Sequence, residues 1–102
     1  MIYIKFGPGT KITFQGHAGQ APRGEDIVCA GVSTLYFTFY AACEAKETVM
    51  GDIKLLEAEP VYKNRVAFNT VKRGLEILAA RYPGYVKILN NDYPTATKNN
   101  SL

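Results

Sequence analysis

The chain of 102 residues has few side chains that bind metal ions or form cross-links. It contains two cysteines, one histidine and no tryptophan. A structural zinc site needs four converging ligands, which this supply of Cys and His does not provide. Along one helix, Cys29 and Cys43 would lie about 21 Å apart, far beyond disulfide reach. We therefore expect two reduced thiols, no metal and no other cofactor.

Concentrated charge and long apolar runs are also scarce. Charged residues make up 21% of the chain, and the net charge is only +3. Lys and Arg are interspersed with Asp and Glu along the sequence rather than clustered, so we expect no nucleic-acid partner. The longest nearly uncharged segment, 27–43, contains Thr, Ser and Gly, so it predicts a core helix rather than a membrane span. The apolar start of the chain is interrupted at Lys5, so we expect no targeting signal and a cytoplasmic location.

A chain of this length supports one domain. We expect residues 1–89 to form it and the polar segment 90–102 to be a frayed tail. With 47% hydrophobic residues, the domain has enough apolar side chains for a modest core.

Hydrophobic periodicity predicts the order strand, strand, helix, strand, strand, helix, strand. Alternating residues indicate the strands and helical spacing indicates the helices. The predicted strands are 2–6, 11–15, 48–50, 53–59 and 85–89, and the predicted helices are 27–43 and 61–82. This pattern predicts a two-layer α+β domain with about five strands, in which both helices cover one sheet face. The other face is either solvated or paired with a second copy.

The first predicted helix has two neighbouring stripes. One is apolar and is expected in the core: Val28, Val32, Leu35, Phe39 and Cys43. The adjacent stripe contains Cys29, Ser33, Tyr36 and Tyr40. Its tyrosines either pack at the edge of the domain or form a surface for a substrate or partner.

A thiol and an imidazole lie close together in the sequence. His17, the only histidine, stands in Gly16-His17-Ala18-Gly19, which suits a loop leaving a strand. That loop is expected to continue through Gly24 and to end where the helix begins at Ile27. Cys29 would then lie in the first helical turn, where free backbone N–H groups and the helix dipole favour a thiolate.

Two interpretations of Cys29 and His17 follow from the residues alone. Cysteine is among the most buried residue types, so a helical Cys29 is often an inert core residue, and a histidine beside glycine is often a turn residue. Alternatively, an imidazole beside a thiol converts it into a nucleophile, as cysteine hydrolases require.

The motifs that surround these residues resemble the ribosomal-processing cysteine proteases. The similar segments are Gly16-His17-Ala18 and Asp26-Ile27-Val28-Cys29-Ala30, followed by Val32-Ser33. The segment 74–86 also resembles the final helix and strand of that family, so the similarity covers most of the chain. Gly31 stands where the family more often has Ala, and the segment 47–64 matches poorly, which bears on substrate preference.

The resemblance implies that Cys29 is the nucleophile and His17 its general base. Asp26 matches an acidic position of the family and would either cap the helix or orient His17. Gly16, Gly19 and Gly24 would supply the flexible backbone of the intervening loop. The family also implies a homodimer and a substrate with aromatic or apolar residues near the cut.

The expected function is therefore a cysteine endopeptidase that removes the N-terminal extension of a bacterial large-subunit ribosomal protein. Backbone N–H groups around Cys29 would form its oxyanion hole. Three alternatives remain at this point: a phage or prophage protease that matures a capsid protein, a non-catalytic module that binds ribosomes or RNA, and a structural protein that keeps the fold.

Overall fold

The computed structural model describes residues 1–16 and 23–89, and the side chains of 23–26 lie outside this description. The elements follow the predicted order. Their bounds are β1 Ile2–Gly7, β2 Lys11–Gln15, α1 Arg23–Cys43, β3 Lys46–Met50, β4 Ile53–Glu57, α2 Tyr62–Arg81 and β5 Val86–Leu89. The α+β class, the five strands and the two helices are all confirmed.

The five strands form one mixed sheet in the order β3-β4-β2-β1-β5. Neighbouring strands are antiparallel except β1 and β5, which run parallel. Two parallel neighbouring strands need a crossover connection. Helix α2 provides it, since it carries the chain back to the end of the sheet at which β1 begins, where β5 starts beside β1.

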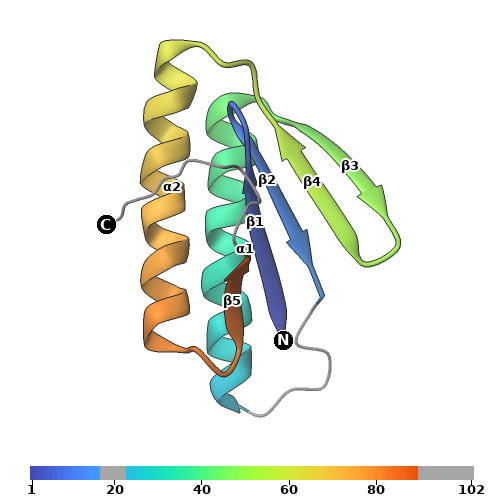
Figure 1. Ribbon diagram of the computed structural model, residues 1–102, viewed down its shortest axis with the longest axis vertical. Helices are drawn as coiled ribbons and strands as arrows, with labels where there is room; N and C mark the ends of the chain where they lie inside the picture. The colour runs from blue at the N-terminus through green and yellow to red at the C-terminus, as the bar shows by residue number, and fades with distance from the viewer. Residues whose placement is uncertain (17–22, 90–102) are drawn as a thin grey trace.

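Both helices pack on the same face of the sheet, as Figure 1 shows. Register places alternate residues of the strands on this face, where they are buried beneath the helices: Ile2, Ile4, Phe6, Ile12, Phe14, Leu56 and Val86. The residues between them point to the opposite face, which no described element covers. The helical layer is therefore the side on which a cavity between helix and sheet can form.

The two helices approach closely at two glycines. A Cβ on Gly31 of α1 would lie 3.3 Å from a methyl group of Leu78, and one on Gly74 of α2 would lie 3.0 Å from a methyl group of Leu35. Each glycine therefore accepts a leucine of the other helix. The lack of a side chain at Gly31 leaves the space that the Leu78 side chain fills.

Helix α1 begins at Arg23, four residues before the predicted start at Ile27. The prediction that Gly24 lies in a loop is therefore wrong. Apolar periodicity begins only at Ile27, but the acidic residues Glu25 and Asp26 carry the charge that the positive end of a helix dipole favours. Glycine also costs a helix only about 1 kcal/mol relative to alanine, which the long apolar face of α1 can offset.

The buried face of α1 also differs slightly from the predicted one. Val28, Val32, Phe39 and Cys43 are buried as expected, but Tyr36 is buried where Leu35 is only partly so. Leu35 instead faces Gly74 of α2. Among the described helices, none is long and apolar enough to span a membrane.

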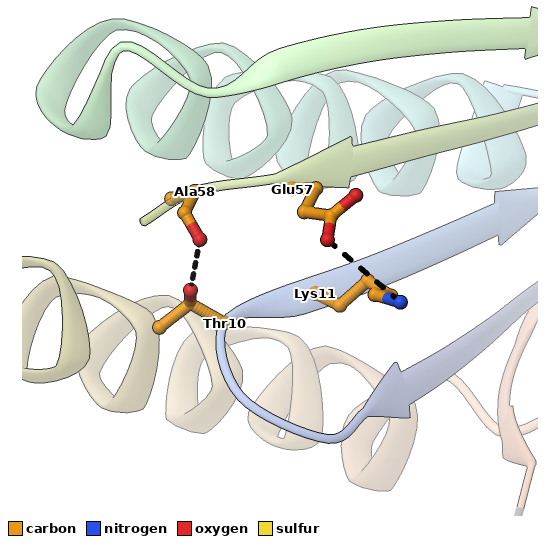
Figure 2. Close-up of polar contacts among 4 residues, drawn as sticks. All are labelled: Thr10, Lys11, Glu57 and Ala58. Carbon is orange, nitrogen blue, oxygen red and sulfur yellow. Dashed lines mark hydrogen bonds and ion pairs between the residues drawn. The ribbon is translucent and has the colours of Figure 1, made fainter. Parts of the chain in front are cut away.

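Thr10 connects the β1–β2 turn to the end of β4 (Figure 2). Its buried side-chain hydroxyl donates a hydrogen bond to the carbonyl oxygen of Ala58. The Ala58 N–H in turn donates to the Thr10 carbonyl oxygen at 3.0 Å. This pair continues the β2–β4 contact past the last ladder position and satisfies polar groups that water does not reach.

We expect Thr10→Val to lower the free energy of unfolding by about 1–3 kcal/mol, because the nearly isosteric change leaves the buried Ala58 carbonyl without this donor. Thr38→Val is the matched control, since the Thr38 hydroxyl donates to Thr34 on an exposed face of α1. Urea unfolding of both variants measures the difference. Equal losses would show that the Thr10 hydrogen bond contributes no more than an exposed one.

Candidate functional site

A cavity of about 500 Å³ opens between α1 and the ends of the central strands. Its wall combines residues from β1, β2, α1, β4 and the β3–β4 turn. The lining residues are Ile2, Phe14, Gly16, Cys29, Val32, Ser33, Tyr36, Phe37, Gly51, Asp52 and Lys54. Most of this wall is apolar, and the Cys29 thiol is its one described sulfur.

Helix α1 supplies almost half of the wall because one stripe of the helix faces the cavity. Cys29, Ser33 and Tyr36 lie three or four residues apart and therefore share a helical face. Phe37, which is 61% exposed, extends this surface toward solvent. The stripe that the sequence placed beside the core is thus the cavity wall, and Tyr40 of the same stripe is exposed beyond it.

Cys29 is partly buried and is the seventh residue of α1. The prediction that it lies in the first turn is therefore wrong, since the helix starts earlier than its apolar pattern. Only the first four N–H groups of a helix lack an intrahelical acceptor. The backbone N–H of Cys29 is consequently not free for a substrate oxygen, and the dipole effect that is strongest in the first turn is weaker here.

Tyr36 forms a polar contact in the wall of the cavity. Its hydroxyl donates a hydrogen bond to the Glu47 carboxylate on β3, and burial together with this carboxylate raises the tyrosine pKa. Tyr36 therefore stays a neutral donor at physiological pH. The Phe14 ring meets it edge to face at 5.0 Å, and the Lys54 Nζ lies 5.6 Å from its centroid. These contacts restrain the Tyr36 ring to one position in the cavity wall.

The end of β2 reaches the cavity at Gly16, the residue directly before His17. Gly16 has a φ of 89°, which favours glycine, and a Cβ there would collide with the Met1 carbonyl oxygen. Its N–H donates to the carbonyl oxygen of Asp52 at 3.2 Å. The β3–β4 turn therefore fixes the position from which the chain continues into His17.

The described residues bring together only part of the predicted site. Cys29 and Gly16 line the same cavity. His17 and Gly19 lie outside the described residues, and so does the side chain of Asp26, whose backbone belongs to the first turn of α1. Within residues 1–16 and 23–89, no group of three or more His, Cys, Asp or Glu side chains is arranged to hold a metal ion.

The second thiol has a different environment. Cys43 is only 5% exposed at the end of α1, and burial raises its pKa although the positive charge of Lys63 acts in the opposite direction. It does not line the cavity. By position, Cys29 is the cysteine that a peptide can reach.

Six parts of the cavity wall were missed by the sequence analysis: Ile2, Phe14, Val32, Phe37, Lys54 and the Gly51-Asp52 turn. The predicted strands 48–50 and 53–59 leave a connection at 51–52, but only the register of β4 against β2 brings this turn to Gly16. Lys54 pairs with Phe14 across this ladder, so it points to the helical side although its charge suits solvent. The one sequence signal for Phe37 was its position next to Tyr36 on a helical wheel.

Comparison with known proteins gives a consistent result. The family model described as Cysteine protease Prp matches residues 1–87. A curated relative, the ribosomal processing cysteine protease Prp of Mycoplasma genitalium, is 31% identical over 85 residues, which cover 78% of this chain and 86% of the relative.

Solved structures share the fold. One is the essential ribosomal processing protease Prp from S. aureus with a covalently linked product peptide, at a TM-score of 0.66 and 19% identity over 85% of this chain and 94% of that one. The same protease with a substrate peptide gives a TM-score of 0.67 and 18% identity over 86% of this chain and 95% of that one.

Limiting iodoacetamide at neutral pH should alkylate Cys29 at least about tenfold faster than Cys43, because Cys29 lines an open cavity whereas Cys43 is buried with a raised pKa. Mass spectrometry of chymotryptic peptides measures both rates; trypsin would leave the two cysteines on one peptide. Unfolding in urea should remove the difference. Faster labelling of native Cys43 would contradict the arrangement of the site.

Proposed function

The chain belongs to the family of Prp cysteine proteases, and we propose that it is an endopeptidase in which Cys29 is the nucleophile and His17 the general base. Its proposed substrate is the N-terminal extension of a bacterial large-subunit ribosomal protein, which it would meet in the cytoplasm. The relatives' own names, which describe ribosomal processing, support this substrate class.

One observation supports this proposal above the others. The Cys29 thiol lines an open, mainly apolar cavity, and Gly16, from which the chain passes directly to its only histidine, lines the same cavity. A buried, inert cysteine would not be expected in such a wall. A module that only binds RNA would need neither the thiol nor the imidazole.

The proposed reaction proceeds in two steps. His17 accepts the thiol proton while the Cys29 sulfur attacks the scissile carbonyl carbon, and the imidazolium then protonates the leaving amine as the peptide bond breaks. Water hydrolyses the resulting thioester, with His17 again accepting a proton, and the carboxylic product leaves the regenerated thiol. No metal takes part in this scheme.

The cavity wall suits the apolar or aromatic residues expected near the cut. Phe14, Val32 and Phe37 offer apolar surface around the thiol, and burying such surface contributes roughly 25 cal/mol per Å² of binding free energy. The Tyr36–Glu47 hydrogen bond restrains the Tyr36 side chain in the cavity wall. A preorganised wall lowers the entropic cost of binding an extended peptide.

Two further expectations stay predictions. The family resemblance implies a homodimer, which sedimentation equilibrium tests. Residues 1–89 are proposed to form the catalytic domain, consistent with a family match that ends at residue 87; a chain ending at residue 91 should keep the melting temperature and the cleavage rate.

His17→Ala should lower the turnover number by about 10² to 10⁴, the usual range for the loss of a general base. The assay is cleavage of a ribosomal protein with its N-terminal extension, followed by mass spectrometry of the new N-terminus. A capsid precursor serves as the alternative substrate for a phage role. Cleavage at the wild-type rate would contradict the assignment, because the chain has no second histidine.

Asp26→Asn separates the two roles proposed for this carboxylate. A large rate loss at unchanged melting temperature would show that Asp26 orients His17. The expected capping role is wrong, because Asp26 is the fourth residue of α1 and not its N-cap; a lower melting temperature with a modest rate loss would show that its charge stabilises the first turn through the helix dipole. Glu25→Gln is the matched control, since it removes the neighbouring charge from the same helical turn.

A further inference from the structure

Four lysines from four strands share the sheet face that the helices leave uncovered. Lys5 of β1, Lys11 of β2 and Lys87 of β5 alternate with buried residues that point into the core. Lys46 of β3 joins them, because its partner Glu57 pairs in turn with Lys11. Although these lysines are scattered along the sequence, register places all of them on one surface.

The lysines follow a diagonal across this face. Lys46 and Lys11 occupy the same row of the sheet, Lys5 lies one row further on β1, and Lys87 lies another row further on β5. Neighbouring strands lie about 4.8 Å apart and each row is about 6.8 Å further along a strand, so the track is roughly 23 Å long. We call these four residues the lysine track.

The negative charge on this surface is small. Among the residues paired in the described ladders, Glu57 is the one acidic side chain on the open face. Its carboxylate lies 3.8 Å from the Lys11 Nζ, an ion pair that is drawn in Figure 2. Lys5, Lys46 and Lys87 are exposed, and the described structure contains no ion pair to any of them.

An aromatic ring lies beside the track. Tyr3 pairs with Lys87 on β5 and with Gln15 on β2, and it is 38% exposed on the open face. Single-stranded nucleic acids bind proteins through a positive surface that follows the phosphates and an aromatic ring on which a base stacks. Tyr3 and the lysine track place these two features side by side on one sheet.

Contrary to the expectation from the order of charges along the sequence, we propose that the open sheet face binds single-stranded nucleic acid, with the lysine track on the phosphates and Tyr3 under a base. A second copy of this chain suits the surface less well. Pairing two such faces would bring two lysine tracks together. Of the apolar β3 and β4 residues on this face, Ile53 and Leu55 are already partly buried, and only Met50, at the end of the edge strand β3, is 58% exposed.

This surface is separate from the cavity. Phe14 and Lys54, which line the cavity, point to the helical side of the same sheet. The face can therefore hold a nucleic acid while the cavity holds a peptide, and its binding can be measured without any cleavage assay.

Fluorescence anisotropy of the full chain with labelled U20 and dT20 tests the proposal. Neutralising one phosphate of a single strand contributes about −0.7 to the slope of log K against log salt concentration. Three to four engaged lysines predict a slope between about −2 and −3. Lys5→Gln/Lys87→Gln should make the slope less negative by about 1.4 and weaken binding about tenfold or more at low salt. Stronger binding of U20 than of dT20 would identify RNA rather than DNA as the ligand.

The matched control removes two positive charges from the helical layer. Arg65 and Arg81 are exposed on α2, so Arg65→Gln/Arg81→Gln lowers the net charge equally but leaves the sheet unchanged. Its salt slope should equal that of the wild type. Tyr3→Ala should weaken binding about tenfold without changing the slope, and Tyr3→Phe should restore it, because stacking needs the ring and not the hydroxyl.

Three results would overturn the proposal. The first is equal loss of affinity in the two double variants, which would show that net charge alone attracts the strand. The second is a slope near zero. The third is a wild-type dimer that becomes tighter in Lys5→Gln/Lys87→Gln in sedimentation while no U20 or dT20 binds, because loss of repulsion between two facing tracks would assign the face to a second copy.

Discussion

The structure depends on the burial of one sheet face beneath two helices. Ile4 and Ile12 from the sheet and Val28 and Phe39 from α1 are fully buried in this layer. Because successive helical residues are about 100° apart, burying Val28 turns Cys29 toward the edge of the interface. The position of the thiol is thus a consequence of core packing.

The same constraint shapes the cavity. Toward its N-terminal end, α1 shares the cavity wall with Gly16 after β2 and with the β3–β4 turn. The Gly16 N–H donates to the Asp52 carbonyl oxygen, and Gly16 lies so close to the Met1 carbonyl oxygen that any Cβ there would collide with it. Contacts such as the Tyr36–Glu47 hydrogen bond then fix part of the wall that the Cys29 thiol also lines. A packed two-layer domain thereby leaves an accessible site at its edge.

Local patterns predicted the elements well, because strand alternation and helical spacing follow from which residues are buried. The order of all seven elements, the covered face and the placement of Cys29 and Ser33 on one helical stripe were available from the sequence. The predicted start of α1 was wrong, because the first turn of the helix is polar and shows no apolar periodicity. Strand order and register join segments distant in sequence, so Asp52 beside Gly16 and the four aligned lysines required the structure. The role of His17 rests on the family resemblance and its sequence position.

The most direct test of the account is the detection of an acyl-enzyme at Cys29. The full chain is mixed with a peptide ester that carries aromatic residues before the ester bond, quenched in acid and measured by intact mass and peptide mapping. We expect the mass to rise by that of the acyl fragment, with the adduct on Cys29 and none on Cys43. Hydrolysis of the same ester at an undiminished rate by the Cys29→Ala variant, or an acyl group found on Cys43 in the native protein, would contradict the claim that Cys29 carries the reaction.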